Sequence, residues 1–88
     1  MARIALASTA RAKLAGLLLD WADQAAKRAA SDVHFQLRMT HEEIGELVGS
    51  SRETIARILS DFRRRGLIQS EGRSITISDR SKLEALLF

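Results

Sequence analysis

The chain has 88 residues, which is the size of one small domain. At this size a single hydrophobic core is only just sufficient to stabilise the fold. It contains no cysteine, which excludes disulfides and thiolate metal sites, and no apolar run approaches the length of a membrane span. A net charge of +3 permits a polyanionic partner. The N-terminal sequence makes a poor signal peptide, so a cytoplasmic protein is predicted.

The first predicted element is a helix over about residues 8–29, with Ser8 at the N-cap position. Its apolar side chains recur at helical spacing and form one stripe. We interpret the tryptophan in this stripe as a core anchor rather than a residue that stacks on a ligand. Residues 29–33 predict a polar loop, and residues 35–38 alternate in the manner of a short strand. The stripe consists of Leu14, Leu17, Leu18, Trp21 and Ala25.

Two short helices joined by a glycine turn form the predicted centre of the chain. Thr40 begins the first helix, because its hydroxyl and the Glu43 carboxylate can form a capping box. Gly49 stands where a left-handed residue would end that helix. Either Ser50 or Ser51 caps the second helix, and we favour Ser51. The apolar faces are formed by Ile44, Leu47 and Val48 in the first helix and by Ile55, Ile58, Leu59 and Phe62 in the second.

Beyond Gly66, which ends the second helix, the period of apolar residues changes from 3.6 to 2. Residues 67–70 and 73–78 read as two strands, with Glu71-Gly72 as a two-residue hairpin turn between them. The predicted fold class is therefore mainly α with a small β-hairpin, arranged as a winged helix-turn-helix. A last short helix is expected. Ser78 or Asp79 would cap it, and its apolar side chains would pack it against the core: Leu83, Leu86 and Leu87.

The central segment meets the geometric demands of a helix-turn-helix when His41 is counted as its first position. The fifth position must be small because the helices cross closely there, and it is Gly45. The ninth position favours glycine for the turn, and it is Gly49. The alternative is a helical hairpin that binds no ligand. The core positions are Ile44, Val48, Ile55 and Ile58.

The second helix, expected over about residues 52–64, exposes Arg52, Glu53 and Arg57 near its start. In this motif that part enters the major groove. Arginine can donate twice to guanine and glutamate can accept from cytosine, each worth ~1–3 kcal/mol of discrimination. The alternatives are a surface pair between Glu53 and Arg57, or a capping box between Glu53 and Ser50. We expect the Glu53–Arg57 pair to form without DNA and to aim the arginine.

Four other side chains are predicted to contact DNA phosphates. Thr40, Ser51 and Thr54 carry short hydroxyls near helix N-termini, where backbone amides also favour anions. Arg73 lies at the hairpin and could approach the backbone or the minor groove. Residues 63–65, three arginines, are interpreted either as a solvated cation cluster at a helix C-terminus or as a DNA contact.

Enzymatic function finds no support in the sequence. The two histidines, His34 and His41, lie seven residues apart with no cysteine, so a metal site is not predicted. No serine, lysine or carboxylate has a catalytic neighbourhood. The competing interpretation is a winged helix used as a protein–protein interaction module, with Arg52 and Arg57 facing an acidic partner.

The sequence resembles the C-terminal DNA-binding domain of the Crp/Fnr family of bacterial transcription regulators. The resemblance covers about residues 8–80. It is carried by residues 39–59, by Gly66-Leu-Ile and by the hairpin sequence at 72–77, and Ser-Arg-Glu-Thr-x-x-Arg is its most specific part. One departure is Ser50, where the cyclic-AMP receptor branch often has cysteine.

This resemblance implies that Arg52, Glu53 and Arg57 read bases in a TGTGA-like half-site of double-stranded DNA. It implies phosphate contacts from Thr40, Ser51 and Thr54. Family members carry an N-terminal sensor domain and a long dimerisation helix, for which residues 1–88 leave no room. The chain is therefore either one domain of a larger homodimeric regulator, monomeric by itself, or a stand-alone winged helix. We expect the first, with RNA polymerase as a further partner. No cofactor is expected in this chain, since a cyclic nucleotide or other effector would bind the absent sensor domain.

Overall fold

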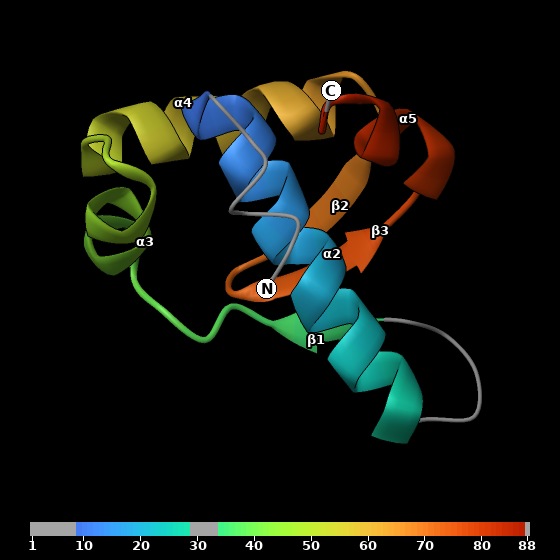
Figure 1. The fold of residues 1–88 in the computed structure, drawn as a ribbon. Helices are drawn as coiled ribbons and strands as arrows, with labels where there is room; N and C mark the ends of the chain where they lie inside the picture. The colour runs from blue at the N-terminus through green and yellow to red at the C-terminus, as the bar shows by residue number, and fades with distance from the viewer. Residues whose placement is uncertain (1–8, 29–33, 88) are drawn as a thin grey trace.

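The computed structural model describes residues 9–28 and 34–87, and its elements follow the predicted order (Figure 1). The predicted N-cap Ser8 and the predicted loop over residues 29–33 lie outside the described residues. The elements are α2 (Ala10–Arg28), β1 (His34–Gln36), α3 (His41–Val48), α4 (Arg52–Arg64), β2 (Ile68–Glu71), β3 (Ser74–Ile77) and α5 (Arg80–Ala85).

Helix α2 is the long central element against which α3, α4, α5 and β1 all pack (Figure 1). In its first turn the amide of Ala12 donates to the Thr9 hydroxyl at 3.0 Å, which satisfies one of the free amides of a helix start. Trp21 is buried among the apolar side chains, so its interpretation as a core anchor is confirmed. Fully buried leucines on α2 supply much of the core: Leu14, Leu18 and Leu19.

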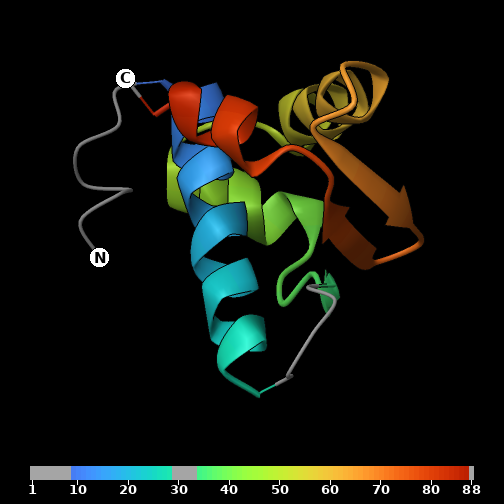
Figure 2. The same cartoon turned by 90° about the vertical axis from the view of Figure 1, so that its right-hand side faces the viewer.

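The sheet is antiparallel, with β3 in the centre and β1 and β2 at its edges. The predicted hairpin is present, but its turn lies one residue later than predicted. Glu71 pairs with Ser74, so the two turn residues are Gly72 and Arg73 rather than Glu71-Gly72. The reason is the backbone of Gly72, whose φ of 62° suits the first position of a tight hairpin turn. This turn points away from α2 (Figure 2).

Helix α3 buries a narrower face than predicted. Ile44, Gly45 and Val48 are buried, whereas Leu47 is 49% exposed and does not belong to the core. At 100° per residue, Leu47 lies about 110° around the helix from the centre of the buried stripe. An eight-residue helix that contacts α2 and α4 along one stripe leaves that position in solvent.

Helix α5 packs against α2. Asp79 is its N-cap, accepting from the Lys82 amide at 3.1 Å, which decides between the two predicted caps. The Arg80 guanidinium donates to Asp23 on α2 at 2.7 Å and to Glu84 at 3.1 Å. Docking of the predicted leucines is confirmed: Leu83 is fully buried, and Leu86 and Leu87 pack against the core.

Two kinds of feature are missing from residues 9–28 and 34–87. None of the helices there is both long enough and apolar enough to cross a membrane. The same ranges contain no group of three or more histidine, aspartate or glutamate side chains that could hold a metal ion. His34 lies exposed on β1 and His41 half-buried at the start of α3.

Candidate nucleic-acid interface

The turn between α3 and α4 is built on Gly45 and Gly49. Gly49 has a φ of 77° and ends α3 in the left-handed conformation, as predicted. A Cβ at Gly45 would lie 2.5 Å from the Ser50 carbonyl oxygen, so only glycine permits this approach. The Gly45 carbonyl also accepts from the Ser50 amide at 2.7 Å. The two glycines thus fix the angle at which α4 leaves α3.

Ser51 is the N-cap of α4, which confirms the favoured choice. Its Oγ accepts from the Thr54 amide at 3.2 Å and donates to the Thr54 hydroxyl at 3.0 Å. Because Ser51 is the cap, Glu53 occupies the second helical position rather than the third. Its side chain is therefore not used in a capping box.

Arg52 and Glu53 form an ion pair at the start of α4, with 3.2 Å between Nε and Oε2. Their side chains are 69% and 66% exposed. A hydrogen bond from its own backbone amide and one from the Arg52 guanidinium hold the pKa of Glu53 below its ordinary value. The expectation that Glu53 would pair with Arg57 is wrong, because the Glu53 carboxylate pairs with the guanidinium of Arg52 instead.

Arg57 is exposed on α4 one turn beyond Glu53. Among the described residues no ion pair involves it. Ala56 and Ser60 are also exposed, so small side chains flank the three larger ones. The structure therefore brings the three predicted base-reading residues together on one exposed face of the first two turns of α4.

Thr40 begins α3 with the predicted capping box. Its hydroxyl accepts from the Glu43 amide at 3.1 Å, and its own amide donates to Glu43 Oε1 at 2.8 Å. Hydrogen bonds from the Thr40 amide and from the Thr40 hydroxyl to the carboxylate, with a smaller contribution from the positive charge of Arg73, lower the pKa of Glu43. Thr40 is exposed at the N-terminus of the helix, where free amides favour an anion.

Arg73 lies at the hairpin turn, but its guanidinium faces the protein. It donates to the carbonyl of Leu37 at 2.7 Å, while the Leu37 amide donates to the Arg73 carbonyl at 2.8 Å. This reciprocal pair ties the hairpin turn to the segment after β1. The predicted phosphate contact by Arg73 requires the side chain to release Leu37.

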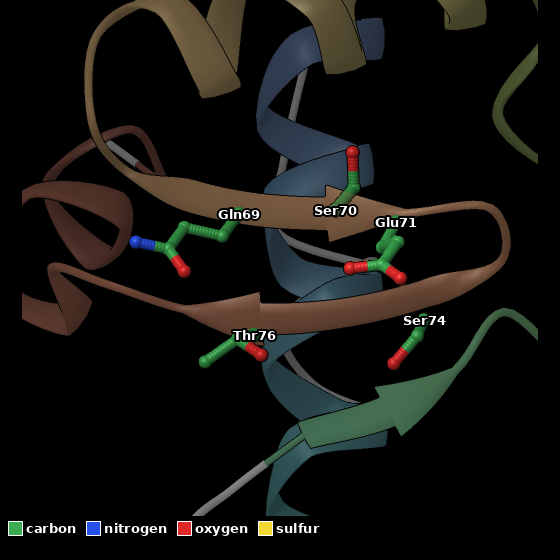
Figure 3. Close-up of a pocket in the computed structure, with 5 residues that line it drawn as sticks. All are labelled: Gln69, Ser70, Glu71, Ser74 and Thr76. Carbon is green, nitrogen blue, oxygen red and sulfur yellow. The ribbon is translucent and has the colours of Figure 1, made fainter.

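The solvent face of the β2–β3 hairpin carries a shallow polar hollow of about 180 Å³ (Figure 3). Glu71 is the one ionisable group in its lining, so the hollow offers an anion no positive charge. Any attraction of this hairpin for a phosphate must come from cations beside the hollow. The lining residues are Gln69, Ser70, Glu71, Ser74 and Thr76.

The cluster around Asp61 was not predicted from the sequence. Asp61 is buried on α4, and Arg11 on α2 binds it at 2.5 Å. Arg64 binds the other carboxylate oxygen at 2.5 Å, and Arg65 lies 3.1 Å from Asp61. Hydrogen bonds from Arg11 and Arg64, aided by the charge of Arg65, lower the pKa of Asp61 to about 2. One signal was available: a carboxylate between apolar core positions requires a cation.

Comparison with known proteins identifies the family. The Crp-like helix-turn-helix domain matches residues 12–86. The chain belongs to this family. Crp-like helix-turn-helix domains are parts of transcription regulators, and membership implies DNA binding.

Relatives of this Crp-like domain include the CRP-like cAMP-activated global transcriptional regulator of Mycobacterium tuberculosis. It is 47% identical over 64 residues, covering 68% of this chain and 29% of the relative. The transcriptional regulatory protein btr of Bordetella pertussis is 37% identical over 75 residues, covering 85% of this chain and 31% of the relative. The chain thus spans about a third of the length of these curated relatives.

Solved structures show the same fold as this Crp-like domain. FixK2 from Bradyrhizobium japonicum superposes with a TM-score of 0.76 at 29% identity, covering 96% of this chain and 42% of that one. A CRP-family transcriptional regulator from Thermus thermophilus gives a TM-score of 0.70 at 29% identity, covering 98% of this chain and 43% of that one. The arrangement of α3, α4 and the hairpin is therefore that of a Crp/Fnr regulator.

Proposed function

We propose that this domain reads double-stranded DNA in a sequence-specific manner through the first two turns of α4. The observation that carries this proposal is the exposed group of Arg52, Glu53 and Arg57 behind the Ser51 cap. A binder without sequence preference gains nothing from a carboxylate among phosphates, so Glu53 favours base reading. The proposed recognition helix is α4, residues 52–64, in the major groove.

The chemistry of the three side chains supports a TGTGA-like half-site. The forks of Arg52 and Arg57 match the O6 and N7 acceptors of guanine, and the Glu53 carboxylate matches the N4 amino group of cytosine. The G·C pairs at the second and fourth positions of TGTGA supply both kinds of partner. The preference for this particular half-site is proposed in addition to DNA binding itself.

Four residues are proposed to hold the DNA backbone: Thr40, Ser51, Thr54 and Arg73. The Thr40 and Ser51 hydroxyls are engaged as caps and the Thr54 hydroxyl accepts from Ser51, but each lies at a helix N-terminus whose remaining amides can donate to a phosphate. Arg73 would exchange the Leu37 carbonyl for a phosphate oxygen, a stronger, charged acceptor. Such contacts position the domain and carry no direct sequence information.

We further propose that residues 1–88 form one domain of a larger cytoplasmic regulator. Its relatives extend well beyond the matched region, which leaves space for a sensor domain that binds an effector such as a cyclic nucleotide. Two copies would read paired half-sites about 34 Å apart, one helical turn of DNA. RNA polymerase is a further proposed partner of that whole regulator.

Selection from a random pool of DNA duplexes tests the proposal, using two copies of the chain joined as a dimer. The expected result is enrichment of a palindrome with TGTGA-like halves. A different enriched half-site would overturn the proposed sequence. The competing interpretation is a protein-contact module in which Arg52 and Arg57 face an acidic partner. Absence of any enrichment, even at low salt, would favour that module over DNA reading.

A further inference from the structure

The carboxylate of Asp61 is surrounded by three guanidinium groups. Its side chain is 8% exposed, Oδ2 binds Arg11 at 2.5 Å, and Oδ1 binds Arg64 at 2.5 Å. Arg65 Nε lies 3.1 Å from Oδ2. Both oxygens are therefore in use, and two of the three cations come from the C-terminal end of the recognition helix.

These two arginines are otherwise well placed for contact with a polyanion. Their side chains are 78% and 60% exposed for Arg64 and Arg65. Arg64 lies seven residues after Arg57 with exposed Ser60 between them, so it continues the face that carries the proposed base-reading residues. Without Asp61, long flexible side chains at this position would be available to DNA phosphates.

We propose that Asp61 lowers the sequence-independent affinity of the domain for DNA by withholding Arg64 and Arg65 from the DNA backbone. This inference rests on the proposed function of α4 and adds to it. Phosphate contacts strengthen binding to every sequence alike, whereas base contacts strengthen binding to one. Withholding two phosphate contacts therefore lowers the affinity for every sequence by the same factor and leaves the discrimination between bases unchanged, so that base contacts supply a larger share of the binding free energy.

Asp61 also ties α4 to α2, and a test must separate that role. Arg11 reaches Asp61 across 50 residues of sequence, and its guanidinium carbon lies 5.8 Å from the centre of the Phe62 ring. Arg11→Ala removes this tie but leaves Arg64 and Arg65 bound to Asp61. Arg11→Ala is therefore the control that separates loss of the contact between α2 and α4 from release of the two arginines.

The experiment measures dissociation constants for random-sequence duplex DNA and for the selected half-site across a salt series. For Asp61→Asn, we expect log Kd to depend on log salt more steeply, by about 0.9 for each arginine that reaches a phosphate. Binding to random DNA and binding to the half-site should tighten by the same factor. Adding Arg64→Ala and Arg65→Ala to this variant should restore the wild-type slope.

Two comparison variants keep the proposal falsifiable. Arg11→Ala should lower the melting temperature and leave the salt slope unchanged. Glu84→Gln, which removes the same unit of negative charge from α5, where Arg80 keeps its bond to Asp23, should not change the slope. An equal rise in slope for Glu84→Gln and Asp61→Asn would reduce the effect to net charge and overturn the proposal.

A second measurement does not alter Asp61 at all. Arg64→Ala combined with Arg65→Ala should leave the salt slope at its wild-type value, because neither arginine contacts phosphate when Asp61 is present. A slope that becomes shallower in this variant would overturn the proposal. The slope on random DNA is independent of base preference, so failure of the proposed half-site would be seen separately, as equal affinity for random and selected DNA.

Discussion

The ion pair between Arg52 and Glu53 uses Nε of the arginine, which lies 3.2 Å from Oε2. A bidentate contact with guanine can be made by the two Nη groups at the end of the same fork. Glu53 can therefore hold the arginine in one orientation while those groups donate to a base. The acid would act both as a reader of cytosine and as a guide for its neighbour.

Substitution of Glu53 by alanine should relax the base preference at one position of the half-site. The expected loss of discrimination is about 1–3 kcal/mol, the usual value of one good base contact. Affinity for random DNA should stay the same or rise, because a negative charge leaves the groove. Competition binding against a set of single-base variants of the half-site measures both quantities.

The matched control for this experiment is Glu46→Ala, which removes one exposed carboxylate from α3 instead of α4. It should leave the base preference as it is in the wild type. If Glu53→Ala also leaves that preference unchanged, the assignment of Glu53 as a base-reading residue is wrong. Arg52→Ala should relax preference at one position in the same way.

A side chain at Gly45 should destabilise the domain even though alanine favours helices. The new Cβ would lie 2.5 Å from the backbone oxygen of Ser50, and a backbone atom cannot move aside cheaply. Overpacking of this kind costs about 1–3 kcal/mol, and the helical gain of about 1 kcal/mol offsets part of it. Gly45→Val should therefore lower the free energy of unfolding more than Gly45→Ala.

Urea unfolding of both variants checks this expectation, with Gly49→Asn as the control. Gly49 has a φ of 77° but open space around its missing side chain, and asparagine tolerates that backbone better than most residues. Its loss should be small. Wild-type stability in Gly45→Val would show that the two helices do not approach as closely as described.

Removal of the Thr40 hydroxyl should weaken α3 at its first turn. Thr40→Ala leaves the Glu43 amide without its acceptor at 3.1 Å, and loss of such a cap costs about 1 kcal/mol. Thr40→Ser keeps the acceptor and should retain nearly all the stability. Thermal unfolding of the two variants measures the difference. Equal destabilisation by serine and alanine would assign the effect to the lost methyl group instead.

The features that could be predicted from the sequence are those decided within a few residues. The cap at Thr40 joins positions three apart, and the Ser51 cap and the left-handed Gly49 are equally local. Spacing along the chain is nearly sufficient for such contacts, because helix geometry supplies the rest. The same holds for the apolar stripes of α2 and α4.

The features that were missed or predicted wrongly depend mostly on the arrangement of whole elements. The hydrogen bond from Arg73 to the Leu37 carbonyl was not predicted, because the two residues lie 36 positions apart in the sequence. Leu47 was expected in the core, but the crossing of α3 with its neighbours leaves it exposed. The Glu53–Arg57 pair failed for a different reason, since the choice between two nearby cations depends on rotamers that spacing does not specify.

Acid should remove the stability that Asp61 contributes. Its pKa is lowered from an ordinary value near 3.8 to about 2 by Arg11, Arg64 and Arg65. A carboxylate with a depressed pKa in the folded state stabilises that state above its unfolded pKa, and this contribution is lost as the pH falls through the folded pKa. The difference in unfolding free energy between wild type and Asp61→Asn should therefore be constant above about pH 5 and shrink between about pH 4 and pH 2.

Urea unfolding at several pH values measures this difference. Glu46→Gln is the control, since no ion pair among the described residues involves that carboxylate. A difference that does not change with pH would mean that Asp61 stabilises the domain through packing rather than through its charge.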